Sequence, residues 1–361
     1  MIQNIKRAKS WVKFQIQNPY GKMLEKIEKE PPRILIGTYV HEYKDYSFNN
    51  WIKRAVEIGN AYPGDVDILI VDNSDNKEYA LKLKNKIKPY QKEVLGMKNS
   101  NALVFKGDIS VLRLSKEYDN TREKQRASQQ VLWDATLGQY PSLFDGKKYG
   151  YLFIIESDIY PPVNALIELL KYNKRICSGL YSLKNDETYE GHKKHLIKSK
   201  VLHKWKAEDI GDYMCVIPFK MRGDSKFLLH RKEIENIRLK AEETQWGHVF
   251  KIFACGLGVI LIRRDVLEEV KPETTTRQQV AFYKSLLRFS KLQEKKYKYH
   301  DQYFVPYLER VANSYEDILN KKIHPDTNFH VLCDKAGISR FVNPYLECEH
   351  DRSDWKDVKF R

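Results

Sequence analysis

Cysteine and long hydrophobic runs are both scarce in this chain of 361 residues. Its five cysteines, an odd number, show none of the paired spacings of a zinc module, and we expect reduced thiols in a cytoplasmic protein. No apolar run approaches the length of a transmembrane helix, and the N-terminus lacks the hydrophobic region of a signal peptide. These absences favour a globular cytoplasmic protein over a secreted or membrane-spanning one.

Several familiar catalytic motifs are missing as well. The sequence contains no P-loop, no G-x-G-x-x-G fingerprint, no nucleophile elbow, no His/Cys cluster with zinc-ligand spacing and no internal repeat. Any catalytic chemistry therefore has to come from a different arrangement of side chains.

The chain also lacks an acidic excess. It has 63 Lys and Arg residues against 48 Asp and Glu residues, which gives a net charge of +15. This charge favours anionic partners, such as a nucleotide substrate, nucleic acid or an acidic membrane face, without deciding among them. With 42% hydrophobic and 12% aromatic residues, the chain can form one large domain or two modest ones.

A short apolar run that ends in two carboxylates is the most informative stretch. Residues 149–162 read YGYLFIIESDIYPP, and the run at 151–155 predicts a strand buried on both faces. Glu156 and Asp158 follow two positions apart, so that in extended backbone both side chains point to the same side. Two hard oxygen ligands at the carboxyl end of a central strand suit Mg²⁺ or Mn²⁺ together with phosphate oxygens. The alternative is that the two carboxylates only begin a loop and cap a helix.

Predicted strands and helices alternate along the first half of the chain. Strands are predicted at 33–39, 66–71, 111–114 and 151–155, and helices at 47–60, 77–90, 121–137 and 163–172. This alternation predicts an α/β fold with a mostly parallel central sheet and helices on both faces.

The second half of the chain is less regular. Strands are predicted at 176–181, 213–219, 249–262 (two strands, or one bent at its glycines) and 328–333, and helices at 264–267, 272–299 and from 300 onward. Residues 182–210 read as a polar loop and residues 220–245 as a charged, exposed segment. Residues 1–31 form a basic, partly amphipathic helix that either lies on a membrane surface or packs on the main domain.

Several short motifs follow one another between residues 33 and 334. They read GTY at 37–39, VDNS at 71–74, ESD at 156–158, SGLY at 178–181, GLGV at 256–259 and DQYF at 301–304. In this order they resemble the GT-A fold glycosyltransferases, in particular glycosyltransferase family 2 and its viral and archaeal relatives. In that family the first three positions are a turn beneath the nucleotide base, a V-D-D/N-S turn and the D-x-D motif. The last three are two acceptor-side strands and the start of the helix that carries the catalytic acidic residue.

The resemblance implies a Rossmann-like GT-A domain over residues 32–334. Its nucleotide-sugar half would be 32–172 and its acceptor half 173–334, between a basic helical extension at 1–31 and a charged C-terminal tail at 335–361. The implied activity is sugar transfer from a UDP- or GDP-sugar to a hydroxyl of a glycan, protein, lipid or modified nucleic acid, with Mn²⁺ or Mg²⁺ as cofactor.

The resemblance also implies roles for individual residues. Asp158 would ligate the metal, and Glu156 would reach it through water or contact the ribose. Thr38 and Tyr39 would form the base pocket, Asp72 with Asn73 would contact the base or ribose, and Arg122 would contact phosphate. Asp301 would be the general base that takes a proton from the acceptor hydroxyl, a role that implies inversion.

Two features depart from the family pattern. The metal motif begins with Glu156 rather than Asp. Related sequences often place a histidine near the end of the last strand as a further metal ligand, and here His330, or else Asp334, takes that place.

Other interpretations stay open at this stage. Asp72 could only cap a turn, Asp301 could only cap a helix, and Arg113, Lys124 or Arg126 could replace Arg122. The basic charge and 23 tyrosines also suit a nucleic-acid-binding protein, or a transferase that glycosylates modified DNA bases. A nucleotidyltransferase would also bind a metal ion through paired carboxylates. The sequence at the end of the first strand and after it, GTYVHEYKDYS, lacks the glycine-rich loop of that class.

Overall fold

The computed structural model describes residues 19–91, 103–114, 121–182, 214–218, 229–243, 249–270 and 325–351, together with residues 285, 288 and 291. The chain divides into two compact units, one made of residues 1–265 and 339–361 and the other of residues 266–338. Within the described ranges, no helix combines the length and the apolar character needed to cross a membrane.

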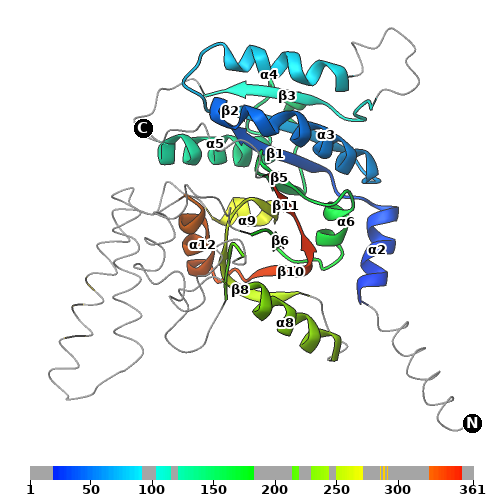
Figure 1. Ribbon diagram of the computed structural model, residues 1–361, viewed down its shortest axis with the longest axis vertical. Helices are drawn as coiled ribbons and strands as arrows, with labels where there is room; N and C mark the ends of the chain where they lie inside the picture. The colour runs from blue at the N-terminus through cyan, green and yellow to red at the C-terminus, as the bar shows by residue number, and fades with distance from the viewer. Residues whose placement is uncertain are drawn as a thin grey trace, which may run out of the picture. The chain divides into compact units, whose positions relative to one another are not determined.

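Across the described residues, nine strands of the first unit form one sheet in the order β3-β2-β1-β4-β9-β6-β10-β8-β7. Figure 1 labels β3, β2, β1, β6, β10 and β8 of this sheet. The strands are β1 (Ile34–Val40), β2 (Val66–Asp72), β3 (Ile109–Arg113), β4 (Tyr151–Ile155), β6 (Ile176–Leu180), β7 (Val216–Pro218), β8 (Phe250–Cys255), β9 (Val259–Arg263) and β10 (Arg340–Glu347). Only β8 and β9 run against the direction of the others in this sheet. The predicted α/β class with a mostly parallel sheet is confirmed.

Continuous apolar sequence explains the centre of this sheet. β1, β2 and β4 are buried at every position, as expected of strands that are covered on both faces. Their parallel pairing brings the carboxyl ends of all three strands to one edge, where Val40 lies opposite Asp72. The loops that follow these strands therefore converge at that edge.

Helices cover both faces of the sheet, as predicted. On one face α3 (Asp45–Ala61), α4 (Tyr79–Ile87) and α6 (Ala165–Leu170) share a core cluster with alternate residues of β1, β2 and β4. On the other face lies α5 (Thr121–Thr136), whose Leu132 is so close to β1 that a side chain at Gly37 would collide with it. The alternating side-chain directions of a strand explain why both layers can be apolar.

The strand order reverses next to β1. β2 and β3 extend the sheet on one side of β1, whereas β4 pairs with its other side. Loops that leave the carboxyl ends of strands at such a reversal diverge, and this is where ligands bind in open α/β sheets. The turn after β4 contains Glu156 and Asp158.

The prediction of a charged C-terminal tail at 335–361 is wrong for the central part of that segment. Residues 340–347 form β10, inserted between β6 and β8, and residues 349–350 form β11 (Glu349–His350), which pairs with β5 (Ile159–Tyr160). Burial in β10 does not alternate, because Arg340 and Asn343 are buried together with Val342 and Leu346, so the segment lacks the two-residue apolar period of a half-buried strand.

The strand predicted at 328–333 is also wrong, because this segment lies in helix α12 (Pro325–Lys335) of the second unit. Its buried Phe329, Leu332 and Cys333 have the i, i+3, i+4 spacing of one helix face. Pro325 suits the first position of a helix, and Gly337 follows its end with a positive φ of 67°. A short apolar run does not by itself distinguish a strand from a helix.

Three further helices complete the described elements. α2 (Pro19–Lys29) belongs to the predicted N-terminal extension, and its Ile27 lies in the core cluster of the first unit. α8 (Arg231–Glu243) occupies part of the segment predicted only as charged and exposed, and α9 (Arg264–Glu269) follows β9 as predicted. Gly256 and Gly258 separate β8 from β9, so the run at 249–262 is two strands.

Candidate functional site

Asp158 lies in the tight turn that links β4 to β5. The backbone N–H of Ile159 donates to the carbonyl of Glu156 at 3.0 Å, and the N–H of Glu156 donates to the carbonyl of Gly258 at 2.8 Å. The carbonyl of Asp158 accepts from the N–H of Asp351 at 2.7 Å. The turn is therefore fixed by β9 on one side and by the C-terminal strand β11 on the other, and the Asp158 side chain is only 2% exposed.

One carboxylate oxygen of Asp158 is paired with Lys44. The Lys44 Nζ lies 3.0 Å from Oδ1 of Asp158. Burial disfavours the charge on this amine, but Asp158 and Glu156 outweigh that effect and raise the pKa of Lys44 above its usual value. Lys44 is therefore an ammonium ion at the end of β4.

The other carboxylate oxygen of Asp158 faces His350. The Nε2 atom of His350 lies 3.6 Å from Oδ2 of Asp158, and its Nδ1 atom lies 2.8 Å from the carbonyl oxygen of Ser182. A carbonyl only accepts, so Nδ1 carries the proton, and in a neutral imidazole Nε2 then presents a lone pair to the carboxylate. Two lone-pair groups that face each other at this distance favour a cation between them.

Glu156 is the second carboxylate of the pair, and it is held by Tyr39. The phenol of Tyr39 donates to Oε1 of Glu156 at 3.1 Å. Glu156 and Asp158 both act electrostatically on Lys44 and on the neighbouring Tyr43, where burial is the main cause that raises the phenol's pKa and the two carboxylates add to it. The two acidic residues therefore act on the same ammonium, although residues 156–158 form a turn and not the extended backbone that the spacing argument assumed.

The residues around Asp158 fit a divalent cation. Carboxylate oxygen and imidazole nitrogen are ligands for Mn²⁺ and related ions, and adjacent ligands of one octahedral ion lie about 3 Å apart. The 3.6 Å between His350 Nε2 and Asp158 Oδ2 is close to that separation. The bond from Nδ1 of His350 to a carbonyl is the arrangement that orients metal-ligating histidines. Asp158 and His350 would hold the ion, with Glu156 beside them.

Asp72 is placed differently from the donor contact that the resemblance implied. Its side chain is fully buried at the end of β2, where Oδ1 accepts from the N–H and hydroxyl of Ser74 and Oδ2 accepts from Arg113 at 2.9 Å. Arg113 also donates to the carbonyls of Ser74 and Asn76. In this structure Asp72 and Arg113 hold the turn after β2, and a nucleotide contact by Asp72 stays a prediction.

The remaining predicted donor residues are distributed around the same edge. Thr38 is fully buried within β1, and its hydroxyl has no hydrogen-bond partner among the described residues. Asn73 is 5% exposed, and its N–H donates to the carbonyl of Val40 at 3.1 Å. Arg122 lies in the first turn of α5, and its side chain is outside the described residues, as is the whole of Asp301.

His330 lies on helix α12 of the second unit, and not at the end of a strand. It is fully buried there, beside Phe329 in an edge-to-face ring contact with centroids 5.3 Å apart. Asp334, the alternative ligand, is exposed on the same helix. The histidine that the structure brings to Asp158 is His350, which the sequence did not single out.

A second polar cluster joins the loops after β1 and β2. The imidazole of His41 lies between Glu42, at 2.9 Å, and Asp75, at 3.6 Å, and one ligand atom from each residue lies within 4.8 Å of the others. Lys124 of α5 already pairs with Asp75. The cluster links the loops after β1 and β2, and its three side chains have ligand types and separations that also suit a cation.

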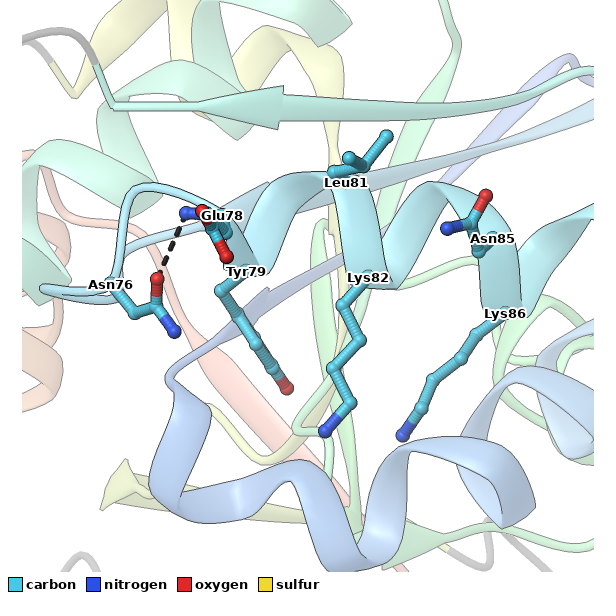
Figure 2. A pocket seen from close by; sticks show the side chains of 7 residues that line it. All are labelled: Asn76, Glu78, Tyr79, Leu81, Lys82, Asn85 and Lys86. Atoms are coloured by element: carbon cyan, nitrogen blue, oxygen red, sulfur yellow. Dashed lines mark hydrogen bonds between the residues drawn. The ribbon is translucent and has the colours of Figure 1, made fainter.

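A hollow of about 510 Å³ runs along α4 and contains none of the predicted site residues. Figure 2 shows Tyr79, Lys82 and Lys86 extending from α4 in one direction, away from Leu81. All three donate to the Asp45 carboxylate at the start of α3. The two ammonium groups are therefore already paired, and the hollow lies along residues 76–86 alone.

Lys44 and His350 are the two residues that the sequence did not identify. Lys44 lies in no recognisable motif, and nothing distinguishes it from the many other lysines of the chain. His350 had a usable signal, because a histidine was expected near the end of the last strand. That strand was placed at 328–333 instead of 340–347, and the expectation was therefore applied to His330.

No protein-family model matches this chain, and no curated protein matches it. Solved structures do show similarity. The structure of A197 from STIV is 12% identical, with 68% of this chain and 71% of that chain covered and a TM-score of 0.29. A mannosyltransferase from Pyrobaculum calidifontis, in complex with GDP-Man and Mn²⁺, is 9% identical, with 74% and 58% covered and a TM-score of 0.33.

A third similar structure is glucosyl-3-phosphoglycerate synthase from Mycobacterium tuberculosis in complex with Mg²⁺ and UDP. It is 9% identical, with 70% of this chain and 62% of that chain covered and a TM-score of 0.31. The chain thus spans less than two thirds of the length of these two enzymes. Similarity at this level does not carry an activity over, so the chemistry has to be inferred from the residues of the site.

Proposed function

We propose that this protein is a glycosyltransferase that moves a sugar from a nucleoside-diphosphate sugar to an acceptor hydroxyl, with Mn²⁺ or Mg²⁺ bound at Asp158. The observation that carries the proposal is the pairing of His350 Nε2 with the Asp158 carboxylate at 3.6 Å, at the carboxyl edge of a mostly parallel sheet. The choice of a nucleotide sugar as donor comes from the sequence motifs, whose order resembles that of the GT-A enzymes.

Loss of a nucleoside diphosphate from a sugar creates negative charge on the leaving phosphates. A divalent cation at this site neutralises that charge. Asp158 and His350 would hold the ion, and Glu156, oriented by Tyr39, would bind it through water or contact the ribose. Lys44 places a further positive charge 3.0 Å from Asp158, where it can also attract a diphosphate. Asp301 would accept the proton of the acceptor hydroxyl.

A donor screen tests the activity directly. Purified protein with Mn²⁺ is offered UDP-, GDP- and dTDP-sugars, and the released nucleotide is measured. We expect release from one nucleotide class, loss of release when the metal is chelated, and a reduction of about 100-fold or more in Asp158→Asn.

The matched control is Asp65→Asn, because Asp65 is an exposed aspartate that pairs only weakly with Arg33 at 3.4 Å. It should keep full activity. Release that is independent of metal, or unchanged in Asp158→Asn, would overturn the proposal. Release of pyrophosphate from a nucleoside triphosphate, with no reaction of any sugar nucleotide, would favour the nucleotidyltransferase instead.

A further inference from the structure

The carboxylate site already contains a cation, and that cation is Lys44. The Asp158 side chain is 2% exposed and the Lys44 side chain 18% exposed, so their contact at 3.0 Å is largely removed from solvent. Charge interactions are much stronger there than in water. The position of the ammonium therefore has a strong effect on any second cation that binds to Asp158.

The backbone holds Lys44 in place. Lys44 ends the short 3-10 helix η1 (Glu42–Lys44) and directly precedes α3. Its N–H donates to the carbonyl of His41 at 2.8 Å, and its carbonyl accepts from the hydroxyl of Ser47 at 2.8 Å. The carbonyl of Ser47 accepts in turn from the phenol of Tyr160, at 3.2 Å, on the strand that follows Asp158. The start of α3 and the Asp158 turn are therefore tied together.

The charge balance decides how the site responds to ligands. Asp158 and Glu156 supply two carboxylates and Lys44 one ammonium, so these three side chains together carry one excess negative charge. A divalent cation alone would reverse that sign and would lie close to the ammonium. A diphosphate brings at least two negative charges, which stabilise the metal ion and the ammonium together.

We propose that Lys44 is a resident counter-cation that makes binding of the metal depend on binding of the donor diphosphate. It weakens binding of a divalent cation on its own and strengthens binding of the diphosphate once the metal is present. The inference rests on the proposed function, because it requires a metal at Asp158. Metal and diphosphate then bind cooperatively, since each makes the site more favourable for the other.

A purely structural ion pair would behave differently. If Lys44 served only to stabilise the fold, its replacement would lower the melting temperature and leave the affinity for Mn²⁺ unchanged. The two roles are therefore separated by measuring metal binding and stability on the same variants.

The first experiment measures Mn²⁺ alone, by electron paramagnetic resonance of the free ion. Lys44→Met should bind Mn²⁺ about tenfold more tightly or better than the unmodified protein, because the repelling charge is gone. If Lys44→Met fails to fold, Lys44→Gln replaces it in the measurement, because glutamine keeps a hydrogen-bond donor for Asp158. Its Mn²⁺ affinity should also be higher than that of the unmodified protein. Lys53→Met should bind as the unmodified protein does, since Lys53 is exposed on α3.

The second experiment titrates inorganic pyrophosphate into the Mn²⁺-saturated protein by calorimetry, with the Mn²⁺–pyrophosphate complex in solution accounted for. Lys44→Met should bind pyrophosphate about tenfold more weakly, while Lys53→Met should not change. Equal Mn²⁺ affinity in the unmodified protein and Lys44→Met overturns the role of Lys44 and leaves the metal site standing. Absence of Mn²⁺ binding in every variant overturns the metal site itself, and the proposed function with it.

Discussion

The position of one proton decides the character of the candidate site. The hydrogen bond to the Ser182 carbonyl places a proton of His350 on Nδ1, so that Nε2 of the neutral imidazole offers Asp158 an electron pair and Nε2 of the imidazolium offers it a hydrogen bond. Tyr181 supports this orientation through an edge-to-face contact between the rings, with centroids 5.9 Å apart. The same Tyr181 hydroxyl accepts from the N–H of Gly258 at 3.1 Å. The imidazole is therefore positioned by two elements before any ligand arrives.

We predict that His350→Ala weakens Mn²⁺ binding by tenfold or more, because an ion at Asp158 loses its nitrogen ligand. His330→Ala is the matched comparison, since His330 is equally a histidine and lies buried on α12. That variant should lose stability and keep its Mn²⁺ affinity. Calorimetric titration of Mn²⁺ into both proteins decides between the two histidines. A loss of affinity in His330→Ala alone would restore the ligand that the sequence indicated.

The residues of the site were only partly predictable. Glu156 and Asp158 could be identified because their neighbours in the sequence, an apolar strand and a turn, determine where they lie. Lys44 and His350 reach Asp158 through the pairing of β5 with β11 and the position of η1, which depend on the packing of the whole unit. Local sequence contains no information on such contacts, and one misplaced strand was enough to move the histidine ligand to another segment.

At the scale of elements, α3 connects the site to the rest of the sheet. The indole N–H of Trp51 donates to the carbonyl of Ile155 at 3.1 Å, and Arg54 donates to the carbonyl of Pro161 at 2.7 Å. These bonds fix α3 on both sides of the Asp158 turn. Elements with a long, regular period were predicted closely, as α3 and α5 show. β10 was missed because buried polar residues interrupt its apolar pattern, and α12 was missed because a short apolar run fits a strand as well as a helix.

Asp45 joins α3 to α4, and we predict that Asp45→Asn lowers the free energy of unfolding by about 1–2 kcal/mol at pH 7. Its carboxylate accepts from Tyr79 at 3.0 Å and from Lys82 and Lys86 at 2.7 Å. Most of the effect should come from Lys86 and Tyr79, because the Lys82 side chain is 55% exposed and its pairing is screened by solvent. Urea unfolding measures the difference.

The same variant has a defined pH dependence. Burial would raise the pKa of Asp45, but the hydrogen bonds from Lys82 and Lys86 outweigh it and hold the pKa below its usual value of 3.8. The carboxylate therefore stabilises the fold above pH 3.8, and this contribution disappears as the pH falls through the lowered pKa. Asp45→Asn and the unmodified protein should converge in stability below that pH. Glu78→Gln, an exposed change beside α4, should show no difference. Equal stability of Asp45→Asn at pH 7 would contradict the role of Asp45.

At the scale of the whole molecule, the first unit contains the carboxylates, the ammonium and the histidine, whereas Asp301 belongs to the second unit. Under the proposed function, metal and donor binding are assigned to residues of the first unit and proton removal to Asp301. The net charge of +15 serves the first task, since it favours an anionic donor. The sequence predicted the division of labour only through the order of its motifs, and Asp301 lies outside the described residues.

We predict that Asp301→Asn separates the two tasks. Asparagine keeps the size of the side chain and much of its capping ability but is not a base, so sugar transfer should fall by about 100-fold or more. Binding of Mn²⁺ and of the donor should stay near that of the unmodified protein, because these ligands are assigned to Asp158, His350 and Lys44. Transfer is measured with the donor found in the screen, and binding by calorimetry on the same preparation. Unchanged transfer would reduce Asp301 to a helix cap, whereas a parallel loss of donor binding would place Asp301 among the nucleotide or metal contacts.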